Sequence, residues 1–249
     1  MISKNQIKQV KALHLKKFRE QQKQFIAEGV KIALEILNLR NEIVNHVYVT
    51  EEFYQSIKHL LKDNFNLVTQ NELERISTLS TPNSILIVCN YFPLTGTYLN
   101  PSEHFTLYLD DIRDPGNMGT ILRTADWFGM KEIFASEKSI EIYNPKTIQA
   151  AMGAFLRVKV HYCSIDEIKK KYSFPIYGAV LNGSDIYTEK TENGLIVIGN
   201  EANGISEEVM KHVNRLITIP SAGSNNTESL NAAVAASIIC SEFFRKKAR

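Results

Sequence analysis

The sequence predicts an α/β protein built from two regions of unequal size, and three observations carry this prediction. Apolar runs of strand type alternate with helix-type segments along the chain. In the second region these runs are short and end in Gly or Asp, which is typical of a parallel sheet covered by helices on both faces. Glycine use also changes, because residues 1–100 contain only Gly29 and Gly96 whereas the remaining residues contain ten glycines.

The first region, residues 1–97, has the pattern of a small α/β sandwich. A basic helix is predicted over 4–15 and a short strand at 25–27, and the apolar positions from 33 to 37 mark a helix with one apolar face. The remaining predicted elements are strands at 43–49, 66–68 and 84–89 and helices at 51–62 and 71–79.

The second region is predicted to span residues 104–249, after a linker at 98–103. The segment 93–101 places two prolines and one glycine between apolar runs, which favours a linker there. The predicted strands lie at 105–109, 132–135, 156–160, 175–181, 195–198 and 215–219, and the predicted helices at 117–129, 144–152, 165–171, 206–213 and 229–245. Ligands of parallel sheets bind beyond the carboxyl ends of the strands, so the loops after residues 109, 198 and 219 are the candidate site.

Composition excludes several classes of protein. Hydrophobic residues make up 44% of the chain and charged residues 22%, as in ordinary globular proteins. No run reaches the roughly 18 apolar residues of a membrane span, and no secretory signal follows the first basic residues. The three cysteines and six histidines show no shared spacing, which argues against disulfides and a metal site. We therefore expect a cytoplasmic protein without membrane segments or metal.

Charge is concentrated at the N-terminus. Residues 1–40 hold nine Lys and Arg against three Glu, whereas residues 101–249 hold 17 basic and 18 acidic residues. A basic segment on a neutral body is typical of a phosphate-binding surface. The alternative is a solvated helix face.

The first candidate loop joins the strand at 105–109 to the following helix. Asn117 either caps that helix or holds the Pro-Gly turn before it, and Gly116 and Gly119 permit close backbone approach. Arg123 lies one turn further on, where a guanidinium reaches a phosphate. The alternative is a turn followed by an exposed helical arginine.

The second candidate loop follows the strand at 195–198 and ends near Ser206. Gly199 and Gly204 have the spacing of a P-loop, but Ile205 stands where the P-loop lysine belongs, so that interpretation fails. Glu201 is placed to orient a ligand. The alternative is a cluster that caps the next helix.

The third candidate loop runs from Pro220 into a helix rich in small residues. Ser229 and Asn231 flank the apolar Leu230, and the alanines at 232–236 favour helix and close packing. The alternative for Ser229 is a helix N-cap.

Together the segments DPGNMGTILRTA, IGNEANGIS and IPSAGSNNTESLNAAVA resemble, in order and spacing, the three motifs of the SpoU/TrmH branch of the SPOUT RNA methyltransferases. The N-terminal KKFREQQKQFIAEGVKIALEIL resembles the substrate-binding domain of many members, a module similar to a small ribosomal RNA-binding protein. The resemblance implies a deep trefoil knot in the C-terminal segment, which periodicity does not predict. It also implies S-adenosylmethionine as methyl donor and a homodimer with its active site at the subunit interface.

The resemblance also assigns residues. The residues carried over as catalytic are Asn117, Arg123, Glu201, Ser229 and Asn231, and those expected around the cofactor are Gly199, Asn200, Ile219, Pro220 and Leu230. For RNA binding, the first candidates in the N-terminal domain are Lys16, Lys17, Arg19 and Lys23.

The implied reaction is methyl transfer to a ribose 2′-hydroxyl in structured RNA, with ribosomal RNA favoured over transfer RNA by the N-terminal module. Arginine is essentially never deprotonated in proteins, so we expect Arg123 to clamp a phosphate and stabilise negative charge rather than act as a base. The alternatives are an inactive RNA-binding or assembly protein and a nucleotide-dependent small-molecule enzyme. The missing phosphate-binding fingerprints argue against the latter.

Overall fold

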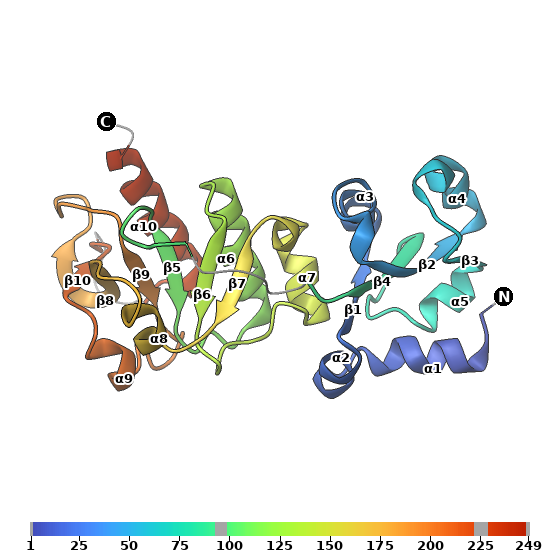
Figure 1. Ribbon diagram of the computed structural model, residues 1–249, viewed down its shortest axis with the longest axis horizontal. Coiled ribbons are helices and arrows are strands. Elements are labelled where there is room, and N and C mark those ends of the chain that lie inside the picture. Colours follow the sequence, from blue (N-terminus) through green and yellow to red (C-terminus); the bar gives the residue numbers. More distant parts are fainter. Residues whose placement is uncertain (1, 93–98, 222–228, 248–249) are drawn as a thin grey trace. The chain divides into compact units, whose positions relative to one another are not determined.

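The computed structural model describes residues 2–92, 99–221 and 229–247 (Figure 1). The chain divides into two compact units. Unit 1 comprises residues 1–95 together with 141–156, and unit 2 comprises residues 96–140 together with 157–249.

Unit 1 contains a four-stranded mixed sheet in the order β1-β4-β2-β3. Its strands are β1 (Gln24–Glu28), β2 (Val44–Thr50), β3 (Phe65–Val68) and β4 (Ile85–Asn90). β4 is antiparallel to both β1 and β2, and β3 is parallel to β2. Its helices are α1 (Lys4–Ala12), α2 (Lys16–Gln22), α3 (Val30–Leu39), α4 (Glu51–Ile57), α5 (Gln70–Glu74) and α7 (Pro145–Ala151), with 3-10 turns at Asn41–Ile43, Lys58–Leu60 and Ala154–Leu156.

Side chains on both faces of this sheet are buried. One cluster joins the strand residues Ile26, Tyr48 and Leu86 to Ile7 and Val10 of α1. α3 contributes a second buried apolar stripe, formed by Ile32, Ala33, Ile36 and Leu37. This is the sandwich that the alternating pattern predicts.

Unit 1 differs from the prediction in several local features. The helices expected over 51–62 and 71–79 end at Ile57 and Glu74. The helix expected over 4–15 ends at Ala12, and α2 follows without having been predicted as a separate helix. The segment 141–156, which lies between strands of the other unit in the sequence, packs on β1: the ring of Tyr143 lies 4.8 Å from Phe25 and 3.8 Å from Tyr91, centroid to centroid. These contacts link residues more than 50 positions apart, which periodicity cannot reveal.

Unit 2 contains a six-stranded, all-parallel sheet in the order β10-β8-β9-β5-β6-β7 (Figure 1). Its strands are β5 (Thr106–Leu109), β6 (Glu132–Ala135), β7 (Lys159–Tyr162), β8 (Ile176–Asp185), β9 (Leu195–Ile198) and β10 (Arg215–Thr218). Its helices are α6 (Pro115–Trp127), α8 (Ile165–Lys169), α9 (Glu207–Met210) and α10 (Ala232–Lys247).

Helices cover both faces of this sheet. Residues of α8 and α9, including Ile168 and Val209, pack in one cluster with strand residues such as Tyr108. On the other face, Phe243 of α10 packs edge-on against Tyr177 of β8 at 5.0 Å between ring centroids, and α10 also contacts α6. The fold class predicted from the sequence is thereby confirmed. The trefoil knot stays a prediction.

β8 is longer than the predicted strand at 175–181 and is irregular. Leu216 of β10 pairs with Gly178, but the next residue, Ile217, pairs with Ser184. Gly183 lies so close to β10 that a Cβ atom there would be 2.7 Å from the carbonyl carbon of Leu216. The absence of a side chain therefore allows the second half of β8 to return to the sheet. No helix among the described residues is long and apolar enough to cross a membrane.

Candidate active site

The first two candidate loops are joined directly at the carboxyl edge of the parallel sheet. The Asp110 amide donates to the Ile198 carbonyl oxygen at 2.9 Å, and the Ser206 amide donates to the Asp110 carboxylate at 2.7 Å. Asn200 Nδ2 donates to the Asp111 carbonyl oxygen at 2.8 Å. Asp111 has a φ of +58°, a conformation that Asp tolerates better than most residues. These bonds bring together residues that are about 90 positions apart in the sequence.

Asn200 organises the second loop. Its backbone exchanges two 2.9 Å hydrogen bonds with Gly204, and its Oδ1 accepts from the amides of Ala202 and Asn203. Gly204 has a φ of +68°. A Cβ at Gly199 would lie 2.3 Å from the Gly204 carbonyl carbon, so the turn requires glycine there. We predicted that Asn200 contacts a cofactor. In the structure its side chain forms the hydrogen bonds that hold this loop.

Three predicted catalytic side chains from three separate segments form one hydrogen-bonded chain. Asn117 Nδ2 donates to Glu201 Oε1 at 2.5 Å, and Asn231 Nδ2 donates to Asn117 Oδ1 at 2.9 Å. Asn117 is buried on α6, whereas Glu201 and Asn231 are exposed. We call these three residues the amide–carboxylate network. It cross-links the three motif loops.

Two capping interpretations from the sequence are wrong. α6 is capped by Asp114, whose carboxylate accepts from the Asn117 amide at 2.8 Å, and Pro115 occupies the first turn, so Asn117 is not the cap. α10 begins at Ala232, and Asn231 Oδ1 accepts from the Ala233 amide at 2.9 Å. Asn231 directly precedes the helix and therefore occupies the N-cap position, so Ser229, two residues earlier, is not the N-cap.

Arg123 lies apart from the network. It is six residues beyond Asn117 on α6, which places it about 120° around the helix axis, and it is exposed. Its guanidinium forms no hydrogen bond or ion pair with any residue that the structure describes. Trp127, one turn further along this side of α6, is 85% exposed. The cation is therefore available to a ligand.

The residues expected around a cofactor lie at the ends of β9, β10 and before α10. The peptide groups of Gly199, Ile219 and Leu230 form no hydrogen bond with another described residue. Leu230 is 47% exposed and Pro220 is exposed. Unpaired peptide groups beside an exposed apolar side chain can hold a heterocycle with polar edges. Residues 222–228 of the third motif lie outside the described residues.

The cysteines do not supply a nucleophile at this site. All three cysteines are buried, and burial raises the pKa of Cys163 to about 11 and that of Cys240 to about 12, so both are neutral thiols at physiological pH. Among residues 2–92, 99–221 and 229–247, no three His, Cys, Asp or Glu side chains are grouped to hold a metal ion.

The predicted RNA contacts in unit 1 divide into two kinds. Lys16, Lys17 and Lys23 are exposed. Arg19 is only 2% exposed, and its guanidinium pairs with Glu141 and donates to the Leu13 carbonyl oxygen at 2.7 Å. Since a buried and paired guanidinium cannot reach a phosphate, Arg19 is not among the RNA contacts that we propose.

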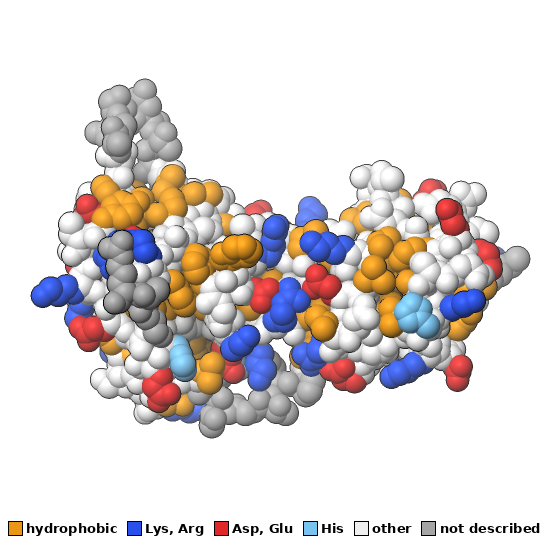
Figure 2. Space-filling view, turned by 90° about the horizontal axis from the view of Figure 1, so that it is seen from above, with side chains coloured by type: hydrophobic (Ala, Val, Ile, Leu, Met, Phe, Trp, Pro, Cys, Tyr) orange, Lys and Arg blue, Asp and Glu red, His pale blue; other side chains and the backbone are white. Residues whose placement is uncertain are grey.

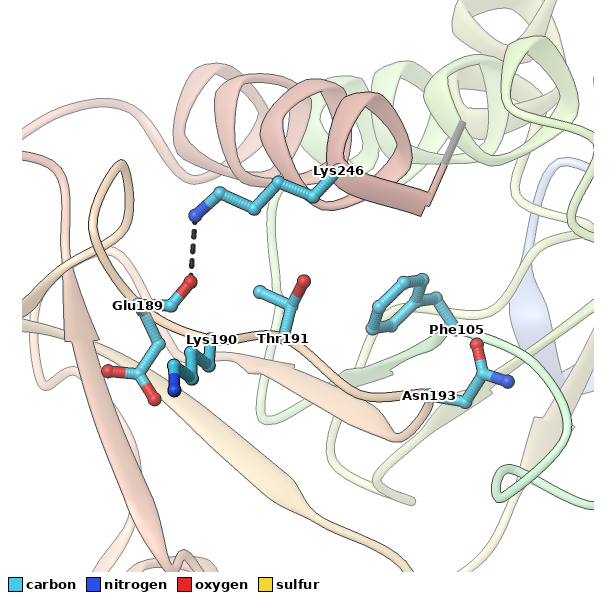
Figure 3. A pocket seen from close by; sticks show the side chains of 6 residues that line it. All are labelled: Phe105, Glu189, Lys190, Thr191, Asn193 and Lys246. Carbon is cyan, nitrogen blue, oxygen red and sulfur yellow. Dashed lines mark hydrogen bonds between the residues drawn. The ribbon is translucent and has the colours of Figure 1, made fainter. Parts of the chain in front are cut away.

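A cavity of about 440 Å³ lies elsewhere on unit 2 (Figure 3). Its lining includes Phe105 and Asn193, which precede β5 and β9, so it sits at the amino edge of the sheet. The Lys246 ammonium donates to the carbonyl oxygens of Ile186 and Glu189 at 2.6 and 2.8 Å. This lysine therefore ties α10 to the segment after β8.

Several residues that build the site were not predicted. Asp110, Asp111 and Asp114 fix the loops and the start of α6, and Thr124 and Ser237 join α6 to α10 through a 2.8 Å bond between their hydroxyls. The Asp114-Pro115 pair was detectable as a helix start. The other contacts join distant segments and leave no local signal.

Comparison with known proteins agrees with this geometry. Residues 104–241 match the model of the SpoU rRNA Methylase family, and residues 4–87 match the MRM3-like substrate binding domain. A curated relative, the 23S rRNA (guanosine(2553)-2′-O)-methyltransferase RlmP of Bacillus subtilis, is 28% identical over 95% of both chains.

Solved structures show the same architecture. A TrmH-family RNA methyltransferase structure from Porphyromonas gingivalis has 33% identity and a TM-score of 0.87 over 99% of both chains. The methyltransferase AviRb of Streptomyces viridochromogenes, solved with AdoMet, shares the fold at 20% identity, with a TM-score of 0.84 over 99% of both chains. The resemblance inferred from the three motifs is confirmed. Since the family model covers more than half of the chain, this protein belongs to the SpoU rRNA methylase family.

Proposed function

We propose that this protein transfers a methyl group from S-adenosylmethionine to a ribose 2′-hydroxyl in ribosomal RNA. The observation that carries the proposal is the amide–carboxylate network, which links one side chain from each family motif at the carboxyl edge of the sheet. The name of the relative RlmP, a 23S rRNA 2′-O-methyltransferase, supports the substrate class. A ribosomal RNA substrate also supports the predicted cytoplasmic location.

The cofactor fits the residues present. The unpaired peptide groups of Gly199, Ile219 and Leu230 are suited to the edges of the adenine and ribose, and Leu230 offers apolar surface. Pro220 borders the same segment, and Asn200 contributes by fixing the Gly199 turn. When bound, the cofactor supplies a methyl group already activated on sulfonium.

The remaining tasks for the protein are positioning and charge stabilisation. The 2′-oxygen forms the new bond to the methyl carbon, the methyl–sulfur bond breaks to leave a neutral thioether, and the hydroxyl proton passes to solvent. Arg123 stays protonated, so it clamps the phosphate beside the target nucleotide and stabilises negative charge that develops on the 2′-oxygen. The hydrogen bonds that join Asn117, Glu201 and Asn231 hold the three loops in fixed positions relative to one another. The exposed Ser229 hydroxyl, two residues before Asn231, is a hydrogen-bond partner for the acceptor ribose.

A homodimer is part of this proposal. Trp127 is 85% exposed on the side of α6 that carries Arg123, and Leu230 and Val234 at the start of α10 are each 47% exposed. Figure 2 shows that hydrophobic side chains gather in patches on the viewed face of this unit. Exposed apolar surface of this kind favours association. A second copy covering α6 would bring its own site towards Arg123.

The dimer can be tested by sedimentation. The variant Trp127→Glu should be monomeric at concentrations where the wild-type protein is a dimer. A Trp127→Glu variant that sediments as wild type would remove this side of α6 from the interface.

Unit 1 supplies RNA affinity in this proposal. Residues 1–97 act as the RNA substrate-binding domain, 98–103 as the linker and 104–249 as the methyltransferase domain. The exposed Lys16, Lys17 and Lys23 contact phosphates, which gives salt-dependent binding without sequence readout.

The proposal is tested by mapping ribose 2′-O-methylation across cellular RNA with and without the gene. We expect one ribosomal site to disappear, to return with the wild-type gene and to stay absent with Arg123→Ala. A lost site in transfer RNA would correct the substrate. If no site changes, the protein is an RNA-binding or assembly factor rather than a methyltransferase.

A further inference from the structure

One helix of unit 1 carries a row of cations that no motif explains. Lys4, Lys8 and Lys11 of α1 are all exposed. Their spacing of four and three residues places them on one side of the helix, in a row about 10 Å long. We call these three residues the α1 lysine row.

The side of α1 next to the lysine row holds the helix on the sheet, about 100° around the helix axis from the row. Ile7 and Val10 are buried in the same cluster as Ile26 and Leu86. Ser3 and Gln6 form a capping box, with the Gln6 amide donating to Ser3 Oγ at 3.2 Å and the Ser3 amide donating to Gln6 Oε1 at 2.9 Å. The row is therefore presented on a fixed support.

Two of the three lysine positions do not favour the helix itself, whereas Lys11 lies in the last turn, where the helix dipole favours a cation. Lys4 occupies the first helical position, where the helix dipole disfavours a cation, and the first turn contains no acidic residue. Lys4 and Lys8 form a like-charge pair at i and i+4, which destabilises a helix slightly. By contrast, Lys16 of α2 has an acidic partner four residues on, Glu20, at 3.6 Å.

No acidic side chain among the described residues pairs with these lysines. Residues 1–19 contain no Asp or Glu. Three exposed cations without an ion-pair partner among the described residues, two of them at positions that disfavour the helix, indicate an anionic partner outside the chain.

We propose that the α1 lysine row binds consecutive phosphates along one strand of the RNA substrate. This inference rests on the proposed function and extends the RNA contacts from α2 to α1. Lysine acts as a point charge on phosphate, so the row supplies affinity and orientation but no base readout. A membrane surface is disfavoured, because such helices insert an apolar face into lipid and the apolar face of α1 is buried in the core.

The test compares two triple variants of the full chain. Lys4→Gln/Lys8→Gln/Lys11→Gln removes the row. Lys58→Gln/Lys62→Gln/Lys170→Gln removes the same charge from three exposed lysines elsewhere. Binding to a transcript of 23S ribosomal RNA is measured at several salt concentrations, together with methyl transfer and thermal unfolding.

We expect the row variant to lower the slope of log K against log salt by about 2 to 3, at about 0.7–0.9 per lost phosphate contact. Its affinity near 0.1 M salt should fall more than tenfold, while the control variant stays within about twofold of wild type. Neither variant should unfold at a lower temperature. At saturating RNA, the row variant should retain the wild-type transfer rate, because the row binds and does not react.

Equal slopes and affinities for the row variant and the wild type would overturn the inference, as would loss of affinity for anionic vesicles instead of RNA. Failure of the proposed function gives a different result. In that case the wild-type protein transfers no methyl group, whereas the row variant still binds RNA more weakly than the control.

Discussion

The two parts of the candidate site are held in opposite ways. Asn117, Glu201 and Asn231 are joined by hydrogen bonds of 2.5 and 2.9 Å across three loops. Arg123, on the same helix as Asn117, is exposed and forms no bond with a described residue. The difference teaches that family residues need not share one purpose: three of them fix the loops, whereas Arg123 has no partner among the described residues and, under the proposed function, pairs with the RNA.

Removing the Arg123 side chain should lower the rate of methyl transfer without lowering stability. Arg123→Ala should lower the rate of methyl transfer by about 10² to 10³, because one charged donor to a developing negative charge is lost. Its free energy of unfolding should stay within about 0.5 kcal/mol of wild type, since the side chain is exposed. Single-turnover transfer and thermal unfolding measure the two effects, and Arg123→Lys controls for charge without the planar fork.

Substitution of Gly199 tests the part of the site that is held by hydrogen bonds and close packing. Gly199→Ala forces a Cβ to 2.3 Å from the Gly204 carbonyl carbon and should destabilise the protein by about 1 to 3 kcal/mol and weaken cofactor binding. Gly204→Ala is the matched control. No atom lies within 4 Å of a Cβ at this position, so the substitution loses only the stability that corresponds to backbone strain at φ +68°. Chemical denaturation should rank Gly199→Ala as the more damaging change, and equal effects would contradict the packing argument.

Asn117 joins both halves of the network, so its loss should have a moderate effect on stability. Asn117→Ala should cost about 1 kcal/mol, because the exposed Glu201 and Asn231 can bind water instead. A double-mutant cycle of Asn117→Ala with Asn231→Ala should show coupling of at least about 0.5 kcal/mol. A cycle of Asn117→Ala with Arg123→Ala should show no coupling. Coupling between these two substitutions would place Arg123 inside the network.

The far end of α10 should show a small effect unrelated to the site. Hydrogen bonds from Arg245 and Lys246 hold the pKa of Glu242 at about 2, against an ordinary value of 4.5. Since the folded-state pKa is lowered, this contribution is present above about pH 4.5 and is lost as the pH falls towards 2. Glu242→Gln should remove roughly 1 kcal/mol of that pH dependence and leave methyl transfer unchanged. Acid unfolding curves that coincide for variant and wild type would contradict this.

Much of the fold follows from local pattern. The strands predicted at 132–135 and 195–198 have those bounds in the structure, because buried parallel strands are continuous apolar runs. The second half of β8 was missed because it depends on Gly183 lying against β10. The burial of Arg19 was missed because its partner, Glu141, is 122 residues away.

The sequence predicts residues of the candidate site that the structure brings together, but it does not predict the hydrogen bonds that join them. The motifs identify Asn117, Glu201 and Asn231, yet nothing in their spacing shows that one amide bridges the other two. The isolation of Arg123 follows from its angular position on α6, which becomes informative only when the contacts of that helix are known. Distances across a sheet edge are set by topology and not by the local sequence.

The most direct test of this division is a calorimetric titration of S-adenosylmethionine into two variants. Arg123→Ala should bind the cofactor with an affinity within about twofold of wild type, because the proposed partner of Arg123 is the RNA and not the cofactor. Asn117→Ala should bind it at least about tenfold more weakly, because the loops that form the cofactor site lose their cross-link. The reverse ranking would contradict the division into a fixed network and a free arginine.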